Sequence, residues 1–567
     1  MAADRPTAIA IYPTGYTSVS PFHCQSDPDC SGRHYFCYRF KLHVIAGYER
    51  KHLMLFRKNS FLFKPRRYTS ISLWRNVTPE QWNNPDWQKS NSIRNVEQLR
   101  KVIKLSSLQV SEIARTIASL KNEGKDPLRI TPYYSTLMQA DPFHPVMLSD
   151  ENEQCRLDPI FWQSVPTPAN LLFPDTGVEG AMHEGSRSYG AAYQRYPNRV
   201  ALFVAENTSC ASYCIHCQRS KSLDCTVEVS RREISKGLFY INYNRNIDEV
   251  LVTGGDALMI STSRLQFVLE ELSRIPHLRS IRIATRVPVV LPMAITDDLL
   301  DMIRTSANLH NRGIRKYVYF MTHFNHYQEI TQEAADAAQR IQDHGFTIRN
   351  QTVFLNHVND RYKTLAETFR RMFWIGVHPH YLLQCHKEKG IVHFIAPIQV
   401  GKIYMKHLQG WISGITIPKY AANVEGGGGK ILLMPSGHDT LNLQSDIEER
   451  IAESYATVTT WDSRELQQYE ALGRSTRREF EKSVAVMDAF IGRKGVFLPK
   501  VIIIDCHNRH IETTNRSRLP RLEKSGKTKR LGYTVYHNEM PLTNPAKIAG
   551  KLDKLFDRSP WRTRRTR

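Results

Sequence analysis

Three of the ten cysteines in this sequence, Cys210, Cys214 and Cys217, fall within eight residues. Thiolates are soft ligands that favour zinc, copper(I) or iron–sulfur clusters. A closed zinc site needs four protein ligands, and the next cysteine, Cys225, lies eight positions farther on, outside that spacing. Three thiolates on a 4Fe-4S cluster leave one iron open to another ligand. The spacing therefore indicates a cluster with an open iron, which suits catalysis.

A Gly-Gly-Asp sequence, Gly254–Asp256, follows the apolar residues Val250–Val252. Two glycines let the backbone approach a ligand closely, and the carboxylate beside them can accept a hydrogen bond from an amino group or a hydroxyl. Such a sequence is more often only a turn, but its place one predicted strand after the cysteines favours a ligand site. Thr285-Arg286 ends the next apolar run, where the arginine could hold a carboxylate or form a surface ion pair.

Four glycines precede Lys430 in the run Glu425–Lys430. A phosphate-binding P-loop is excluded, because Val424 occupies its first glycine position and Ile431 its Ser/Thr position. The run places one amine on a compliant loop, and such an amine can form a Schiff base with an aldehyde cofactor such as pyridoxal phosphate. The alternative is a flexible linker with a solvated lysine, and the glycine run alone favours the linker.

Strands and helices alternate through the centre of the chain and must position these residues. The strands are expected at Val200–Val204, Val250–Val252, Ile281–Ile283, Val318–Met321, Gln351–Leu355 and Tyr381–Leu383, and helices at Thr262–Ile275, Asp297–Ile303, Gln332–Gln342 and Leu365–Ile375. This order predicts an α/β fold with a parallel barrel or barrel-like sheet. The cysteine loop follows the first strand, at the carboxyl edge where active sites gather in such folds.

Composition predicts a globular protein whose positive charge lies largely at its ends. Hydrophobic residues make up 41% of the 567 residues, and no apolar run is long enough to cross a bilayer. The formal net charge is +22, but residues 31–70 hold ten Lys or Arg against one acid, Glu49, and the last seven residues hold four Arg. Basic ends are usually solvated or used for targeting. We therefore expect no nucleic-acid partner and no membrane partner.

The amino-terminal part combines a basic segment with helical patterns. Met54–Ser72 has five basic residues and no acid, a composition typical of an organellar transit peptide. The alternative is a plain extension over residues 1–72. Farther on, Ile93–Ile103 and Ser111–Leu120 have apolar residues at helical spacing. The clustered cysteines indicate a reducing compartment. We therefore expect an intracellular protein, mitochondrial if the basic segment is a transit peptide and otherwise cytoplasmic.

Taken together, these motifs resemble those of the lysine 2,3-aminomutase family of radical S-adenosylmethionine enzymes. The resemblance is dense over roughly residues 73–436. It is carried by Leu73–Val77, Arg129–Tyr134, Arg195–Val200, Cys210–Cys217, Leu251–Leu258, Ile281–Pro292, His323–His326, Asn350–Gln351, Gly390–Phe394 and Gly426–Lys430. So many ordered matches are highly specific to the family.

The resemblance implies an isomerase with three cofactors: a 4Fe-4S cluster, S-adenosylmethionine and pyridoxal 5′-phosphate. The implied reaction moves an amino group from C2 to C3 of a free L-amino acid by a radical route. The matching positions are Cys210, Cys214 and Cys217 for the cluster, Gly254, Gly255 and Asp256 for adenosylmethionine, Arg195, Tyr196, Arg199 and the catalytic Lys430 for pyridoxal phosphate, and Arg219 for the substrate α-carboxylate.

The chain departs from the family's lysine enzymes at the residues that choose the substrate. In those enzymes two Asp side chains grip the distal ammonium, whereas His386 and Asn423 stand at the matching positions here. Neither is an anion, and the family's glutamate 2,3-aminomutases are similar in having a basic residue and an Asn there. We therefore expect an acidic or neutral substrate, unless Glu388 or Glu425 replaces the lost acids in a shifted register.

These features divide the chain into five expected parts. They are an amino-terminal extension (1–72), a helical and loop-rich region (73–198), a partial (βα)6 radical S-adenosylmethionine barrel (199–385), a lysine and substrate-pocket segment (386–440) and a carboxyl-terminal extension with a basic tail (441–567). The expected partners are the amino-acid substrate, an electron donor for the cluster and further copies of the chain. Two alternatives stay open: a radical enzyme that modifies a lysine of a protein, and a non-catalytic homologue.

Overall fold

The computed structural model describes residues 61–124, 127–143, 157–172, 188–205, 210–217, 228–307, 316–386, 388–396, 398–424, 429–433, 482, 485–493 and 545–562. The chain divides into two compact units, residues 1–60 and 61–567. All described residues belong to the second unit, which contains every element discussed below.

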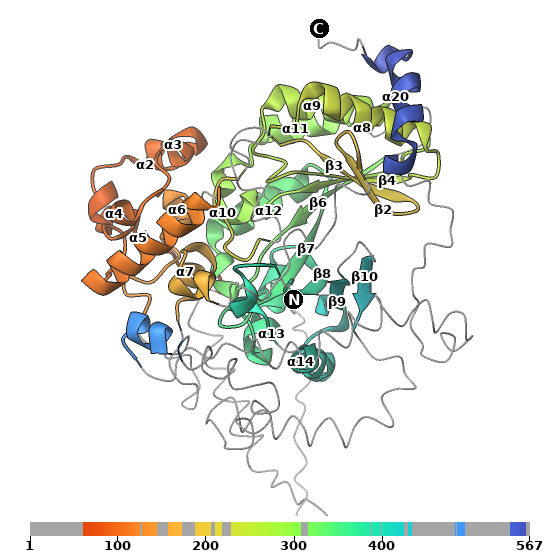
Figure 1. Cartoon of the computed structure of the whole chain (residues 1–567). Helices are drawn as coiled ribbons and strands as arrows, with labels where there is room; N and C mark the ends of the chain where they lie inside the picture. Colours follow the sequence, from red (N-terminus) through yellow and green to blue (C-terminus); the bar gives the residue numbers. More distant parts are fainter. Residues whose placement is uncertain are drawn as a thin grey trace, which may run out of the picture. The chain divides into compact units, whose positions relative to one another are not determined.

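One sheet forms the centre of this unit, and its ten described strands lie in sequence order (Figure 1). Its strands are β1 (Ser188–Tyr189), β2 (Ala192–Tyr196), β3 (Arg199–Phe203), β4 (Glu249–Thr253), β5 (Ser280–Ala284), β6 (Tyr317–Thr322), β7 (Thr347–Phe354), β8 (Val377–Gln384), β9 (Lys419–Val424) and β10 (Gly429–Leu432). Neighbours from β3 to β9 pair in parallel, and β1, β2 and β10 pair antiparallel. The six expected parallel strands are therefore confirmed as β3–β8, within an α/β fold of the partial-barrel type. The sheet also extends past both ends of residues 199–385.

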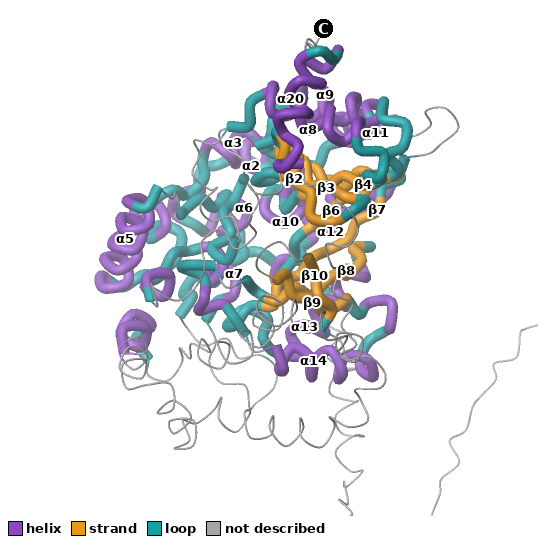
Figure 2. Tube along the Cα trace, turned by 45° about the vertical axis from the view of Figure 1, so that its right-hand side comes forward, coloured by secondary structure: helices purple, strands orange, loops and turns teal. Residues whose placement is uncertain are grey.

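Helices cover the outer side of this sheet. They are α8 (Arg231–Tyr243), α9 (Thr262–Ser273), α10 (Val287–Val290), α11 (Asp297–Ser306), α12 (Gln332–Asp343), α13 (Tyr362–Trp374) and α14 (Ile398–Trp411). Figures 1 and 2 both place α8 and α9 beside β3 and β4, and α13 and α14 beside β8 and β9. Each helix faces the sheet with an apolar stripe, such as Leu265, Val268 and Leu272 of α9, which are fully buried. The four helices expected between the strands are confirmed as α9, α11, α12 and α13.

Alternation along the strands decides which side chains enter the barrel interior. In β3, β4 and β5 the second and fourth residues are buried, whereas the others are half-buried. Because side chains alternate between the two faces of a strand, the buried set packs under the helices and the half-buried set faces the concave side. That half-buried set includes Arg199, Glu249 and Arg282. The concave face is therefore charged.

A helical region precedes the sheet. Its helices are α2 (Pro79–Trp82), α3 (Pro85–Ser90), α4 (Val96–Leu99), α5 (Ser107–Asn122), α6 (Pro132–Ser135) and α7 (Pro159–Ser164). The helix expected over Ile93–Ile103 is wrong in extent, because Ile93 instead pairs with Ile130 in a β-bridge and the Asn95 side chain caps a helix of one turn. The helix expected over Ser111–Leu120 is confirmed within α5, which Ser106 and Gln109 begin with a reciprocal capping box.

Residues 61–72 belong to this folded region. The backbone N–H of Phe63 donates to the carbonyl of Ile330 at 2.8 Å, and that of Arg66 donates to the carbonyl of Thr136 at 2.9 Å. Ile71 is buried. The predicted targeting segment, Met54–Ser72, therefore overlaps the folded body in its second half. Its first half and the rest of the extension lie outside the described residues.

Two described pieces of the carboxyl-terminal extension also pack against the body. Helix α20 (Ala549–Asp557) lies against α8, where Asp553 accepts a hydrogen bond from Tyr189 at 3.0 Å and pairs with Lys236 at 2.9 Å. Around residue 490, the Phe490 carbonyl accepts from Gln109 Nε2 at 3.1 Å. Among the described helices, none combines the length and apolar composition that crossing a bilayer requires.

Candidate active site

The cysteine loop, residues 210–217, is fixed by the helical region that precedes the sheet. The backbone N–H of Tyr213 donates to the carbonyl of Arg129 at 2.8 Å, and that of Thr131 donates to Ser212 Oγ at 3.0 Å. The N–H of Ile215 donates to the carbonyl of Gln163 at 2.9 Å. A loop held by its own backbone at three places keeps its side chains in a set arrangement, so the cysteines are preorganised.

The structure brings Cys210, Cys214 and Cys217 together, and no disulfide joins cysteines among the described residues. Burial raises the pKa of the Cys210 thiol well above its ordinary value, and Asp256, Cys217 and Cys214 raise it further. Burial also raises the pKa of Cys214. Buried thiols with raised pKa values stay protonated until a metal centre replaces their protons. This donor set therefore fits a multiply charged metal cluster.

Arg286, at the end of β5, is the cation nearest to this loop in the described contacts. Its Nη1 donates to Cys214 Sγ at 2.8 Å, and its Nη2 lies 2.6 Å from Glu329 Oε1, 2.8 Å from the Tyr134 hydroxyl and 3.1 Å from Gln163 Oε1. Both ionic side chains are buried, at 7% and 0% exposure. Burial lowers the pKa of Arg286, but Cys214, Tyr134 and Glu329 together raise it above its ordinary value. A permanent charge therefore faces Cys214.

The sequence left open whether Arg286 holds a carboxylate or forms a surface ion pair. In the structure Arg286 pairs with a carboxylate of the protein itself, that of Glu329, and this ion pair is buried. The sequence alone does not single out Glu329 as the partner, because it lies 43 residues from Arg286. Nothing in its local sequence distinguishes it from a surface acid. Only the fold, which brings the segment after β6 under β5, reveals the pair.

Two neutral histidines adjoin Cys214. The side-chain donor atoms of Cys214, His216 and His323 lie within 4.8 Å of one another. Burial lowers the pKa of His323 to about 3 and that of His216 well below its ordinary value. His216 Nε2 lies 3.2 Å from Asn325 Nδ2, and its buried Nδ1 has no hydrogen-bond partner among the described residues. Neutral imidazoles at this place can accept hydrogen bonds from a ligand. The sequence alone gave no role to these two histidines.

The Gly-Gly-Asp turn follows β4 beside the cysteine loop. Gly254 and Gly255 have φ values of +116° and +78°, a backbone conformation that favours glycine. The Asp256 carboxylate accepts from the backbone N–H of Arg286 at 2.6 Å and from that of Leu258 at 3.0 Å. Asp256 thus ties the ends of β4 and β5 together. The carboxylate is engaged by the protein's own amides, so the backbone of the two glycines is what the turn presents to a ligand.

Lys430 lies on β10, where its backbone pairs with Asn423 of β9. Its N–H donates to the Tyr196 hydroxyl at 2.8 Å, and its Nζ lies 5.4 Å from the ring centre of Tyr381. Burial, followed by the charges of Arg282, Arg195 and Arg199, lowers its pKa to about 8. An amine with a lowered pKa is a better nucleophile near neutral pH. Lys430 is therefore a strand residue with a lowered pKa, not a solvated lysine on a flexible linker.

The arginines around Lys430 come from three strands. Arg195 ends β2, Arg199 begins β3 and Arg282 lies in β5. The charges are only partly balanced: Glu249 lies 2.9 Å from Arg282 and 4.0 Å from Arg199. The structure thus brings together the four residues expected at the phosphate-bearing cofactor, and it adds Arg282. The sequence signal that could have found Arg282 is its place on the concave side of an alternating strand.

His386 follows β8 and lies close to the Lys430 site. Burial, then the charges of Arg195 and Lys430, lower its pKa to about 4, so it is neutral near pH 7. Asn423 is placed only through its backbone. Glu388, two residues after His386, is buried at 3% exposure. Arg219 and Glu425 lie outside the described residues, so the structure leaves the substrate pocket partly undefined.

Comparison with family models gives no match. Among curated proteins, the chain is similar to the L-lysine 2,3-aminomutases of Bacillus subtilis, at 33% identity over 67% of this chain and 74% of the relative, and of Clostridium subterminale, at 34% identity over 67% and 85%. It is also similar to the glutamate 2,3-aminomutase of Clostridioides difficile, at 34% identity over 64% of this chain and 78% of the relative. A solved structure, Streptococcus suis SuiB bound to S-adenosylmethionine, matches 40% of this chain and 51% of that chain at 11% identity, with a TM-score of 0.30 that is too low to carry an argument.

Proposed function

Because the chain belongs to the lysine 2,3-aminomutase family, whose Bacillus member it matches at 33% identity over 74% of that protein, we propose that it is a pyridoxal-phosphate-dependent radical S-adenosylmethionine aminomutase. The proposed reaction moves the amino group of a free L-amino acid from C2 to C3. Membership makes the protein an isomerase. What we propose beyond membership is that this chain uses the three cofactors and acts on a free amino acid.

One observation carries this proposal: the cysteine loop and Lys430 adjoin the same strand of the barrel. Arg286, which donates to Cys214 Sγ, follows β5, and Arg282, whose charge lowers the pKa of Lys430, lies within β5. These two arginines are four residues apart in the chain. The cysteine site and the lysine site therefore adjoin one interior and can act on one substrate.

The protein's own residues have distinct tasks in this proposal. When bound, the cluster and adenosylmethionine supply the radical, and pyridoxal phosphate supplies an aldehyde and a phosphate. The neutral Lys430 amine is the nucleophile for that aldehyde, and Arg195, Arg199 and Arg282 are placed for its phosphate. Arg286 donates to Cys214 Sγ and so stabilises negative charge on that sulfur. The surrounding barrel excludes water from the radical.

We propose an acidic or neutral side chain for the substrate. Besides burial, the charge of Arg195 lowers the pKa of His386, so a cation already lies beside His386 and a distal ammonium would be repelled there. A distal carboxylate would be attracted there. Buried Glu388 is the nearest described acid in the sequence, and it is the residue that would restore a preference for lysine.

Turnover by the anaerobically reconstituted enzyme tests both parts of the proposal. Lysine and glutamate are supplied separately with a chemical reductant, and the products are identified by mass spectrometry. We expect 3-amino product from glutamate and little from lysine. Brisk β-lysine formation would overturn the substrate choice and leave the aminomutase reaction intact. A product found only on a protein lysine, or no cluster and no turnover at all, would favour the two alternative functions.

A further inference from the structure

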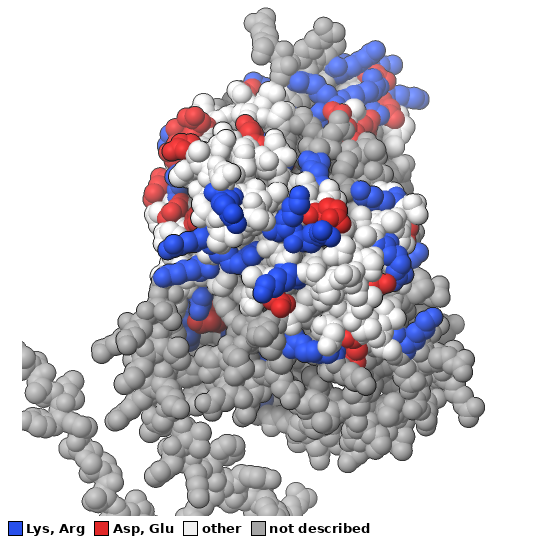
Figure 3. Space-filling view, turned by 90° about the vertical axis from the view of Figure 1, so that its left-hand side faces the viewer, with Lys and Arg blue, Asp and Glu red and all other residues white. Residues whose placement is uncertain are grey.

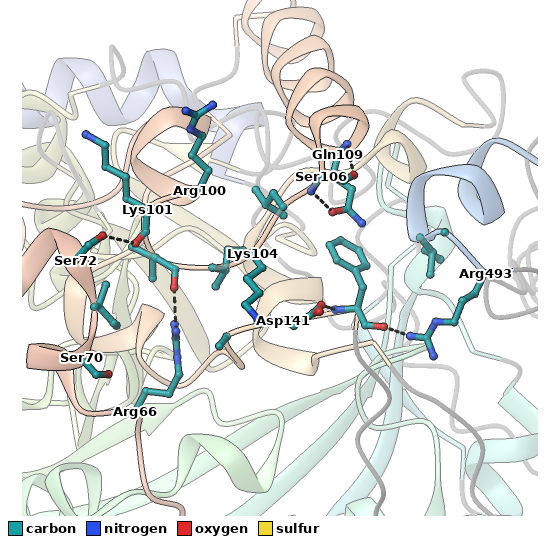
Figure 4. A pocket seen from close by; sticks show the side chains of 18 of the residues that line it. Arg66, Ser70, Ser72, Arg100, Lys101, Lys104, Ser106, Gln109, Asp141 and Arg493 are labelled. Atoms are coloured by element: carbon teal, nitrogen blue, oxygen red, sulfur yellow. Dashed lines mark hydrogen bonds between the residues drawn. The ribbon is translucent and has the colours of Figure 1, made fainter.

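A hollow of about 900 Å³ lies outside the barrel, between the helical region and the segment around residue 492 (Figure 4). Its rim runs from the end of α4 to the start of α5 and is completed by residues 66–75 and 140–143. The charged lining residues are Arg66, Arg75, Arg100, Lys101, Lys104, Arg493 and Asp141. The face of the molecule drawn in Figure 3 shows Lys and Arg gathered in a band. The hollow is therefore a strongly basic concavity.

Most of this positive charge is not neutralised within the described part of the chain. Arg100 pairs with Glu97 at 3.2 Å, but Arg75, Lys101 and Lys104 have no ion-pair partner among the residues that the structure describes. Like charges held together repel one another unless an anion joins them. The lining acid, Asp141, accepts a backbone hydrogen bond from Phe143 at 3.1 Å. The hollow thus has an excess of cations, three of them exposed and unpaired.

Two guanidinium groups at this hollow have unused donors. Arg66 donates from Nη1 to the carbonyl of Val102 at 2.9 Å and from Nη2 to that of Ser135 at 3.3 Å. Its Nε is buried and has no hydrogen-bond partner among the described residues, and the same holds for Nη1 of Arg493. Buried donors without partners are uncommon in native proteins and ask for an explanation. Neither atom has surface that a ligand in the hollow could contact, so these two arginines contribute to the hollow through their charge.

The first turn of α5 adds a further attraction for anions. This helix has 16 residues and begins beside Ser106, which lines the hollow. Its amino-terminal N–H groups and its dipole favour negative charge. Ser70 and Ser72 line the same hollow, and their hydroxyls donate to the carbonyls of Arg67 at 2.6 Å and of Lys101 at 3.2 Å. Cations and a helix amino terminus together form the chemistry that binds phosphate.

We propose that this hollow binds a small molecule with two or more phosphate groups. Its volume of about 900 Å³ lies at the upper end of the range for small-molecule sites, roughly 300–1,000 Å³. A single phosphate would engage only part of the lining, because its cations lie in three segments, residues 66–75, 100–104 and 493. A concave site of this size suits a small polyanion better than the flat surface of a macromolecule.

Calorimetric titration of the full-length holoenzyme with inorganic pyrophosphate tests the proposal. Saturating pyridoxal phosphate is present throughout, so that the arginines near Lys430 are occupied. We expect one pyrophosphate site per chain and weaker binding of inorganic monophosphate. The double variant Lys101→Ala/Lys104→Ala should weaken pyrophosphate binding by about tenfold or more, the effect of losing one to two charge-assisted hydrogen bonds.

A matched control removes the same charge elsewhere. Lys551 and Lys554 are exposed on α20, and Lys551→Ala/Lys554→Ala should leave pyrophosphate affinity unchanged. Equal weakening by both double variants would overturn the proposal, because it would reveal only non-specific attraction. So would the absence of pyrophosphate binding, or tight binding of a short DNA duplex with none of pyrophosphate. Equal melting temperatures of the two double variants would show that a difference in pyrophosphate affinity does not come from a loss of folding.

Discussion

Two sites of the barrel differ in the sign of the charge that they lack: the cysteine end, residues 210–217 with Arg286 and Glu329, and the lysine end, Lys430 with the arginines around it. At the cysteine end the fixed charges balance, because Arg286 faces Glu329 and both neighbouring histidines are neutral. The thiols of Cys210 and Cys214 keep their protons, because burial raises their pKa values. At the lysine end three arginines surround Lys430 with Glu249 as the acid among them. One end can take up a cationic cluster by releasing protons, and the other can take up an anion directly.

This difference indicates that each site binds a ligand of its own kind, a metal cluster at the cysteine end and an anionic cofactor at the lysine end. A buried charge without a partner is costly, so a site that stays folded while unfilled must hide its charge or leave it near solvent. The cysteine end hides it as neutral thiols. The lysine end lowers the pKa of Lys430 so that the amine releases its proton easily. The following predictions separate the two ends.

The largest effect should come from Cys214→Ala. Loss of one of three cluster ligands should remove the iron–sulfur absorption and reduce turnover to background, while the lysine end still retains pyridoxal phosphate. Iron and sulfide content, together with cofactor content after desalting, measure the two ends separately. Cys385→Ala, which truncates a buried cysteine at 3% exposure, is the control and should keep its iron. Loss of pyridoxal phosphate from Cys214→Ala would show that the ends are not independent.

Lys430→Ala should produce the opposite pattern. Turnover should fall to background because the nucleophilic amine is gone, and pyridoxal phosphate should be lost on desalting, while iron content stays at the unmodified level. Lys419→Ala removes an exposed lysine from the neighbouring strand β9 and should retain the cofactor. Retention of turnover in Lys430→Ala would remove the lysine end from the mechanism.

Much of the difference between the two sites could be predicted from the sequence, because the residues that produce it lie in short, local motifs. The three cysteines and the Gly-Gly-Asp turn are short motifs, and the strands before them are continuous apolar runs. Strands β2 and β9 were missed, since Ala192–Tyr196 and Lys419–Val424 mix charged or polar residues with small or aromatic ones and lack such runs. Gln194 of β2 is nevertheless buried, because it accepts a hydrogen bond from the Tyr240 hydroxyl of α8, a partner that lies 46 residues away.

The partners that set the charge at each end could not be found in this way. Arg286 reaches Cys214 across 72 residues and Glu329 across 43 residues. Arg282 meets Lys430 only because seven parallel strands curve β10 back toward β5. Pairing at such separations is a property of the fold. No spacing in the chain encodes it.

Glu329→Gln should weaken the cysteine end without emptying it. The substitution keeps the shape of the side chain but leaves the buried Arg286 charge without its partner, at a cost of about 3–5 kcal/mol. We expect a lower melting temperature and a cluster affinity reduced by about 10–100-fold, as is typical of residues that support a metal ligand. Asp301→Asn breaks the exposed pair with Arg304 and should cost about 0–1 kcal/mol. Equal losses in the two variants would show that burial of the pair adds nothing.

The lysine end should respond to pH. Since the pKa of Lys430 is about 8, the rate of pyridoxal phosphate uptake by the cofactor-free protein should rise about tenfold per pH unit below 8 and level off above it. Glu249→Gln should move this midpoint to lower pH, because Glu249 raises the pKa of Lys430. Between pH 8 and 10.5 the unfolded chain keeps a proton that the folded chain has released, so the free energy of unfolding should rise across that window. Stopped-flow absorption follows the uptake, and a midpoint unmoved by Glu249→Gln would exclude Glu249 as the balancing acid.

The smallest effect should separate backbone strain from ligand binding at the turn beside the cysteines. Gly254 (φ +116°) and Gly345 (φ +81°) both have conformations that favour glycine, so Gly→Ala should cost roughly 1–3 kcal/mol at either position in urea unfolding. The new methyl at 254 would stand 3.0 Å from the backbone nitrogen of Val204, whereas none of the described atoms lies within 4 Å of it at 345. Gly254→Ala should therefore also displace the turn and weaken adenosylmethionine binding to the reconstituted enzyme, while Gly345→Ala should not. Equal adenosylmethionine affinities in the two variants would mean that the turn does not contact this ligand, and the cysteine end would then consist of the cluster loop and its buried ion pair alone.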